Sequence, residues 1–200
     1  RFNRPDFALI DHMTYALVSD GDLMEGISHE ACSLAGHLGL GKLVALYDDN
    51  HITIDGKTDL AFSEDVLKRF EAYGWHTLRA EGQNPVSVNE ALAAAMAETE
   101  RPSIIACRTT IGFGSPNRAG TSKAHGEPLG RDEVRLTKER LGLPVDVDFY
   151  VPDAAREFLG AAAAAGATRM AEWEGLRRRY EAQYPAEAEA LQQMLDGHYD

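Results

Sequence analysis

Two acidic turns, each directly after a short apolar run, constrain the fold of this chain more than any other feature. Tyr15–Val18 leads into Asp20 and Gly21, and Leu43–Tyr47 leads into Asp48-Asp49-Asn50. Between the turns, apolar residues recur at the spacing of a helix with one buried face, at Ile27, Ala31, Leu34, Ala35 and Leu38. Strand, helix and strand in this order predict a βαβ unit with two parallel strands.

Asp20 and Asn50 are expected to meet at one edge of that sheet, because both follow the carboxyl end of a parallel strand. Open α/β sheets bind ligands at this edge, and carboxylate and amide oxygens are ligands that magnesium and calcium prefer. Magnesium keeps water and shares phosphate oxygens, so two or three protein oxygens are enough to clamp a diphosphate. The alternative is that Asp and Asn stand here only because they favour turns.

Strands and helices continue to alternate along the chain. The first strand is predicted at Met13–Val18, and a helix with Ser63 as its N-cap continues through Tyr73. A strand at Trp75–Arg79, a helix at Asn84–Glu98 and a strand at Ser103–Thr109 follow. This alternation predicts an α/β fold with a doubly wound parallel sheet.

The remainder of the chain consists of a long loop and helical segments. Residues 111–130 are rich in Gly, Ser, Pro and Asn, carry His125, and are expected to be a functional loop. A charged helix is predicted at Arg131–Leu141. Beyond residue 150 the chain is rich in alanine and charge, which fits either two helices lying on another surface or a weakly ordered connector. We therefore expect an α/β domain at residues 1–150 and a helical connector at 151–200. The sparse apolar stripe of this connector consists of Leu159, Met170, Trp173, Leu176, Tyr180 and Leu191.

Composition excludes several classes of partner. The net charge of -12 argues against nucleic acid and anionic membranes, both of which require a basic surface. No stretch approaches the roughly 18 apolar residues of a membrane span. The two cysteines, Cys32 and Cys107, form no framework of pairs and are expected to be buried, reduced thiols in a cytoplasmic protein.

Two further patterns are interpreted as structural. GHLGLGKL, at residues 36–43, lacks the Ser or Thr that completes a phosphate-binding P-loop, and its predicted helix precedes its strand. We interpret it as the end of a helix. His29, Cys32 and His37 amount to half a zinc site with no second cluster, which favours packing or interface roles.

Three stretches resemble the transketolases, which depend on thiamine diphosphate (ThDP). They are EGISHEACSLAGHLGLGKLVALYDDN (25–50), FEAYGWH (70–76) and TTIGFGSPNRAGTSKAHGEPLG (109–130). Asp20, with Asn50 thirty positions later, matches the ThDP fingerprint of that family. The resemblance covers most of residues 2–150 and, more loosely, the tail. It implies a partial ThDP-binding fold, the second half of the diphosphate-binding domain, followed by a linker toward a pyrimidine-binding domain that is absent here.

The resemblance also implies a metal and cofactor site. Asp20, the side chain of Asn50 and the backbone carbonyl of Ile52 would bind a divalent ion, magnesium or alternatively calcium or manganese, with the ThDP diphosphate and water completing its shell. Gly21 would approach the diphosphate. Ser19 departs from the glycine that is commoner in the family at the start of this turn.

Further residues match family positions around the reactive end of the cofactor. Ile54 and Ile111 would pack near the thiazolium ring. His125, near the diphosphate and the donor sugar, would help with proton movement. Glu25 and Glu30 match acidic residues near the family's subunit interface.

The implied activity is transfer of a two-carbon ketol unit from a ketose phosphate to an aldose phosphate in the pentose phosphate pathway. The family works as a homodimer whose partner supplies the pyrimidine domain and an activating glutamate, so we expect these 200 residues alone to be inactive. Two alternatives stay open. One is a related ThDP enzyme, a dihydroxyacetone synthase or a deoxyxylulose phosphate synthase. The other is a truncated, non-catalytic module that binds a metal diphosphate.

Overall fold

The computed structural model describes residues 1–198 and divides the chain into two compact units. The sheet unit consists of Met13–Asp148. The helical unit consists of Arg1–His12 together with the residues from Phe149 onward. Each unit is described by itself.

A four-stranded parallel sheet forms the centre of the sheet unit, with the strand order β1-β2-β4-β3. In register, Leu17 of β1 lies beside Leu46 of β2, and Leu46 lies beside Ile105 of β4. The predicted α/β class and parallel sheet are confirmed. The strands are β1 (Thr14–Ser19), β2 (Leu43–Asp49), β3 (His76–Glu81) and β4 (Ser103–Arg108).

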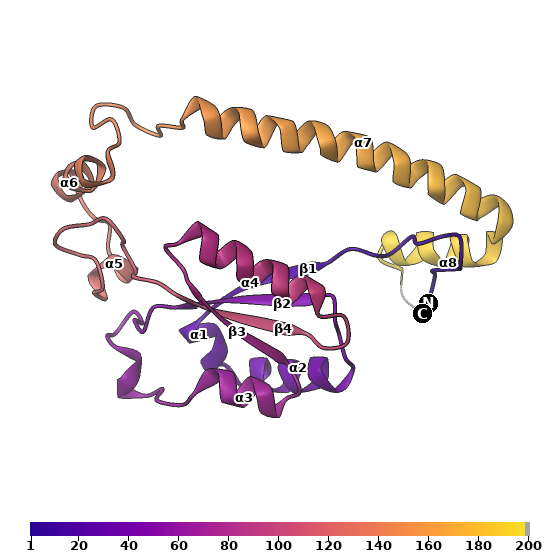
Figure 1. The fold of residues 1–200 in the computed structure, drawn as a ribbon, viewed down its shortest axis with the longest axis horizontal. Helices are drawn as coiled ribbons and strands as arrows, with labels where there is room; N and C mark the ends of the chain where they lie inside the picture. The colour runs from indigo at the N-terminus through magenta and orange to yellow at the C-terminus, as the bar shows by residue number, and fades with distance from the viewer. Residues whose placement is uncertain (199–200) are drawn as a thin grey trace. The chain divides into compact units, whose positions relative to one another are not determined.

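Helices cover both faces of the sheet (Figure 1). On one face, α1 (Asp20–Met24), α2 (Gly26–His37) and α3 (Val66–Ala72) enclose a core around Phe70, Trp75 and Ile104. On the other, Ala91 and Ala95 of α4 (Pro85–Ala97) pack against Val44 and Ile105. Five of the six residues of β4 are buried, as the continuous apolar sequence of a strand covered on both faces predicts.

Helix α2 turns a different side to the sheet than its apolar spacing predicts. Of the five predicted core positions only Ala35 is buried, while Ile27, Leu34 and Leu38 are exposed. The inner side is made of small residues, because the helix runs close to the chain around Trp75. The Trp75 indole donates a hydrogen bond to the Cys32 carbonyl (2.8 Å), and a Cβ added at Gly36 would lie 1.8 Å from the Tyr73 carbonyl oxygen.

The helix predicted from Ser63 begins later than expected. The N-cap is Asp65, whose carboxylate accepts a hydrogen bond from the backbone N–H of Lys68 (3.3 Å). Aspartate caps a helix as well as serine does, so either residue satisfies the sequence pattern. The prediction of Asn84 as the cap of α4 is confirmed, because its side chain accepts from the N–H groups of Val86 and Ser87.

The long loop after β4 contains one short helix, α5 (Lys123–Gly126), and is followed by α6 (Arg131–Leu141) at its predicted bounds. A short 3-10 helix, η1 (Thr58–Leu60), lies between β2 and α3.

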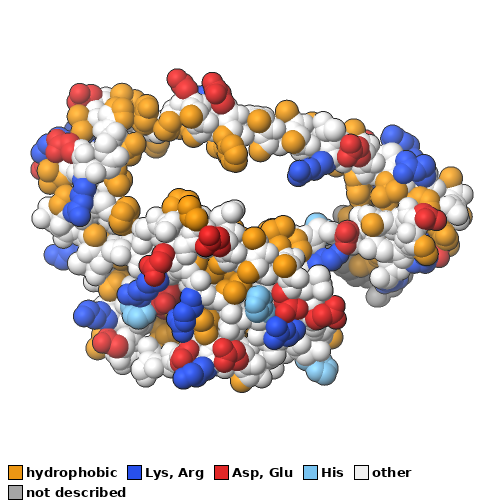
Figure 2. All heavy atoms as spheres, in the orientation of Figure 1, with side chains coloured by type: hydrophobic (Ala, Val, Ile, Leu, Met, Phe, Trp, Pro, Cys, Tyr) orange, Lys and Arg blue, Asp and Glu red, His pale blue; other side chains and the backbone are white. Residues whose placement is uncertain are grey.

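The helical unit confirms the two predicted helices, α7 (Asp153–Gln183) and α8 (Pro185–Leu195). Within the predicted stripe, Leu159 and Met170 on α7 are exposed, Trp173 and Leu176 are half-buried, and only Tyr180 and Leu191 are buried. Figure 2 shows hydrophobic side chains along this exposed part of α7. Residues 1–12, expected within the first domain, pack on the helices instead. The shared core consists of Phe2, Phe7, Leu9, Tyr180 and Leu191.

Across residues 1–198, no helix is both long and apolar enough to cross a membrane.

Candidate functional site

Asp20 is held at the carboxyl end of β1 by a helix start. Ser19 ends the strand, and its backbone N–H and hydroxyl both donate to the Asp22 carboxylate at 2.8 Å, which fixes the first turn of α1. Asp20 follows directly and is only 2 % exposed. The predicted acidic turn is therefore the first turn of a short helix, and it places a carboxylate inside the protein.

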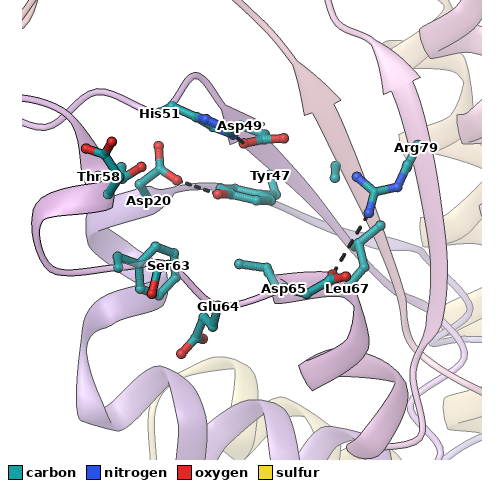
Figure 3. A pocket seen from close by; sticks show the side chains of 14 residues that line it. Asp20, Tyr47, Asp49, His51, Thr58, Ser63, Glu64, Asp65, Leu67 and Arg79 are labelled. Carbon is teal, nitrogen blue, oxygen red and sulfur yellow. Dashed lines mark hydrogen bonds and ion pairs between the residues drawn. The ribbon is translucent and has the colours of Figure 1, made fainter.

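Tyr47 of β2 is the hydrogen-bond partner of one oxygen of this buried carboxylate (Figure 3). Its hydroxyl donates a hydrogen bond to Asp20 Oδ1, and its ring is buried in the core beneath. Asp20 Oδ2 is also buried, and nothing among residues 1–198 forms a hydrogen bond with it. Burial raises the pKa of Asp20, and the hydrogen bond from Tyr47 opposes that rise. Burial, together with the Asp20 carboxylate, raises the pKa of Tyr47, so its hydroxyl stays protonated.

Asn50 and Ile52 lie in the turn after β2, at the same edge of the sheet as Asp20, since Ser19 and Asp48 are paired in register. Asn50 Oδ1 accepts from the backbone N–H of Ile52 (2.8 Å), and Asn50 Nδ2 donates to Asp48 (3.2 Å). Between Asn50 and Ile52, the backbone of His51 is left-handed, with φ of 61°. A non-glycine residue in this conformation is uncommon and frequently marks a functional turn.

These residues fit a divalent cation. A buried carboxylate oxygen without a partner costs free energy, and a bound cation would supply what it lacks. The amide oxygen of Asn50 keeps a second lone pair beyond its bond to Ile52. Oxygen donors of this kind suit magnesium, calcium or manganese.

Two neighbouring pockets open beside the turn. The first, of about 390 Å³, is lined by Asp20, Tyr47 and Asp49. The second, of about 310 Å³, is lined by Asn50 and Ile52 together with two cationic side chains, Lys57 and Arg108. His51, Thr58 and Asp59 line both. Asn50 and Ile52 therefore lie beside the positive charge of Lys57 and Arg108, where an anionic group would meet complementary charge.

The long loop brings the remaining predicted residues together. A Cβ added at Gly126 would lie 3.3 Å from Ile54 Cγ1, and one at Gly112, next to Ile111, would lie 2.9 Å from the Cβ of Ala124. Helix α5, which carries His125, therefore sits against the segments of both isoleucines. His125 is exposed, and Ile54 is 63 % exposed, so Ile54 is not a core residue of this chain.

Glu133 of α6 holds the loop of residues 111–130 through hydrogen bonds, a role that the sequence did not indicate. Its carboxylate accepts from the Ser115 hydroxyl and from the backbone N–H and side chain of Asn117, the latter two at 2.8 Å. These hydrogen bonds lower the pKa of Glu133 to about 2, and the one from the Asn117 side chain contributes most. Arg118 continues the loop with an ion pair to Glu127 (2.8 Å).

The helix end predicted within residues 36–43 is confirmed, because α2 ends at His37 and Gly39 has a left-handed backbone with φ of 61°. His29 hydrogen-bonds the Tyr73 hydroxyl (3.0 Å) and packs against Arg69. Both cysteines are free, but only Cys107 is buried as predicted, and Cys32 is half-buried. In the part of the chain that the structure describes, no three His, Cys, Asp or Glu side chains are grouped to hold a metal. The proposed cation site differs, because it combines one carboxylate with amide and backbone oxygens.

A parallel α/β sheet with a buried acidic group and two pockets at the carboxyl edge of its strands defines a cofactor-binding domain of the doubly wound class. Comparison with known proteins makes this specific. The family described as "Transketolase, thiamine diphosphate binding domain" matches residues 1–200, and the chain belongs to this family.

Relatives and solved structures agree with this assignment. The chain is 49% identical to transketolase 10 of Craterostigma plantagineum and 47% identical to the transketolase of Nostoc, each over 199 residues and 98% of the chain. It superposes on a Leishmania mexicana transketolase with a TM-score of 0.92 at 38% identity. A Pichia stipitis transketolase mutant in complex with fructose 6-phosphate gives 0.91 at 39% identity. In both structures 98% of this chain is covered. The chain spans about 30% of the length of these proteins.

Proposed function

We propose that this chain forms the diphosphate-binding part of a transketolase that moves a two-carbon ketol unit from a ketose phosphate to an aldose phosphate. The observation that carries the proposal is the buried Asp20 Oδ2 at the carboxyl edge of the sheet, which has no hydrogen-bond partner among the residues that the structure describes. A family that binds ThDP gives this oxygen a function, because a divalent cation would join it to the cofactor diphosphate.

The proposed roles of the site residues rest on the resemblance to the family, and the structure supports them with the following observations. Asp20, the Asn50 side chain and the Ile52 carbonyl would bind the cation, magnesium or alternatively calcium or manganese. Gly21 would let the diphosphate approach the backbone, since open space surrounds the position of an added Cβ there. Lys57 and Arg108 add positive charge beside Asn50 and Ile52.

His125, Ile54 and Ile111 would serve the reactive end of the cofactor. When bound, ThDP supplies a thiazolium carbon that carries the ketol unit. The exposed Ile54 and the half-buried Ile111 would gain apolar contact with that ring. His125, presented by α5 beside them, would hold or move a proton near the donor sugar.

A second copy of the complete protein is the proposed partner. Ile27, Leu34 and Leu38 form an exposed apolar stripe on α2, a feature that favours a protein interface. Glu25, the N-cap of α2, and Glu30 within the helix are also exposed. We propose that the pyrimidine-binding domain and the activating glutamate belong to the part of the complete protein beyond these residues, and that this chain alone is inactive.

The names of the relatives favour a transketolase over the related ThDP enzymes. We propose that the complete protein acts in the pentose phosphate pathway, as the resemblance to the family implies. A cytoplasmic location is proposed from the two free thiols, which are typical of a reducing compartment.

Calorimetric titration of the chain with ThDP, with and without magnesium, tests the proposal. We expect binding that requires magnesium and that Asp20→Ala abolishes. Glu81→Ala is the matched control, because Glu81 is an exposed acidic residue that ends β3 at the same edge of the sheet and lines neither pocket. Magnesium-independent binding, or equal loss in both variants, would contradict the proposed site.

A further inference from the structure

We propose that Tyr47 is a positioning residue of the cation site, which holds Asp20 so that a single carboxylate oxygen, Oδ2, faces the cation. The inference rests on the proposed function, and it concerns a residue that the ligand set of the site does not include.

The two oxygens of Asp20 have opposite surroundings. Oδ1 accepts the hydrogen bond from the Tyr47 hydroxyl, whereas Oδ2 is buried and forms no hydrogen bond within residues 1–198. Rotation of the carboxylate is opposed, because it would take Oδ1 from its buried donor. The tyrosine therefore selects which oxygen remains available.

Tyr47 is itself firmly placed. Its side chain is 4% exposed and belongs to the core cluster that contains Leu23, Phe70 and Trp75. The strand β2 that carries it lies between β1 and β4, and Asp20 directly follows β1. The orientation of the Asp20 carboxylate is thus fixed by a residue in the centre of the sheet and not by the turn that carries Asp20.

A buried tyrosine normally finds some hydrogen-bond partner, and a purely structural role is the competing explanation. The two explanations differ in what they predict for ion selectivity. Magnesium demands near-ideal octahedral geometry and suits a carboxylate that offers one fixed oxygen. Calcium accepts irregular shells and binds carboxylates through one or both oxygens, so a carboxylate free to rotate should still serve it.

The test compares Tyr47→Phe with Tyr73→Phe. Both substitutions remove one hydroxyl from the same core region, but that of Tyr73 hydrogen-bonds His29 on α2 and not Asp20. Affinities of the chain for magnesium and for calcium are measured by calorimetry in the presence of ThDP, and unfolding temperatures are measured without a cation.

We expect Tyr47→Phe to weaken magnesium binding by about 10- to 100-fold, the usual effect of removing a group that orients a metal ligand. Calcium binding should weaken less, and Tyr73→Phe should change neither affinity. Equal loss for both ions, or no difference between the two variants, would overturn the role of Tyr47 and leave the proposed function in place. If the unsubstituted chain did not bind ThDP in the presence of either magnesium or calcium, both the proposed function and the role of Tyr47 would be contradicted.

Discussion

At the scale of single residues, Asp20 shows a conflict between stability and binding. Its carboxylate is buried beside Tyr47 with one oxygen unsatisfied, and burial raises its pKa. An uncompensated buried charge opposes folding, so the site costs stability whenever no cation is bound. Replacing the charge should therefore favour the fold while it removes the ligand.

We expect Asp20→Asn to raise the unfolding free energy of the cation-free chain by about 1 kcal/mol, because it removes the buried charge although the amide that replaces Oδ2 still lacks a partner within residues 1–198. This corresponds to roughly 2–4 °C. The asparagine oxygen can still accept the hydrogen bond from Tyr47. Thermal unfolding with and without magnesium and ThDP measures both effects, and the stabilisation by ligand should disappear in the variant. Glu81→Gln, at the exposed end of β3, is the control, and a lower unfolding temperature for Asp20→Asn would refute this explanation.

The sequence predicted the residues whose role depends on position along the chain, and it missed those whose role depends on a partner far away in the chain. Asp20 and Asn50 follow strand ends, which the apolar runs disclose. Tyr47 contacts Asp20 only because β1 and β2 pair in one register, and a tyrosine in an apolar strand is also ordinary core. The sequence around His51 likewise did not predict its left-handed backbone.

At the scale of elements, Glu133 joins α6 to the loop that carries His125. Ser115 and Asn117 near the start of the loop donate hydrogen bonds to the Glu133 carboxylate just after its end. These bonds hold the two ends of the loop together. Because this carboxylate functions in its charged form, acid should open the loop.

Glu133→Gln tests this closure through its dependence on pH. The folded-state pKa of about 2 lies below the ordinary value of 4.5, so the charged group contributes stability fully above about pH 4.5 and loses it as pH falls toward 2. Denaturant unfolding between pH 5 and 2, compared between the chain and the variant, should show a difference in stability that shrinks as pH falls.

The matched control is Glu139→Gln on the same helix, whose carboxylate pairs with Arg135 at the surface. An exposed pair of this kind contributes little, so this variant should follow the unsubstituted chain throughout the range. A difference for Glu133→Gln that stayed constant with pH would show that packing, and not charge, closes the loop.

Helix α2 shows why periodicity identifies a helix more reliably than it identifies the buried face. Its apolar residues recur correctly, but the side that packs is the one small enough to approach Trp75, through Cys32, Ala35 and Gly36. The larger residues Ile27, Leu34 and Leu38 are left outside. Apolar spacing cannot distinguish a face that packs within the chain from one that serves an interface.

This stripe leads to a prediction about association. Leu34→Lys should shift the chain toward the monomer in sedimentation velocity experiments, because leucine at this position is 56% exposed and a charge would have to be buried in an interface. Met96→Lys on α4, where the methionine is 53% exposed, is the control on the opposite face of the sheet. Equal sedimentation of both variants and the unsubstituted chain would exclude the stripe as an interface.

At the scale of the whole molecule, the two compact units have separate cores. The core of the helical unit depends on the first residues of the chain, since Phe7 packs edge-on against Tyr180 and Tyr184 with ring centroids 5.6 and 5.9 Å apart. Trp173 and Tyr180 donate hydrogen bonds to the Leu9 and Phe2 carbonyls at 2.9 and 2.8 Å. The sequence predicted the helices but not this partnership, because residues 1–12 and the tail are separated by nearly the entire chain.

The two tryptophans of the chain allow the units to be followed separately, because Trp75 lies in the sheet unit and Trp173 in the helical unit. Phe7→Ala removes a ring that is only 8% exposed and should cost the helical unit about 3 kcal/mol. In a Trp75→Phe background, fluorescence from Trp173 should report unfolding at a lower denaturant concentration. In a Trp173→Phe background, the transition reported by Trp75 should stay in place.

Phe158→Ala is the matched control for that experiment, since this phenylalanine of α7 is 76% exposed and its loss should move neither transition. If Phe7→Ala shifted both tryptophan signals equally, the chain would unfold as one cooperative unit, and the compact units would not be independent folding domains. If it shifted only Trp173, the sheet unit would keep its stability without the helical core. Cation and cofactor binding could then be assigned to Met13–Asp148 by measuring both in the same variant.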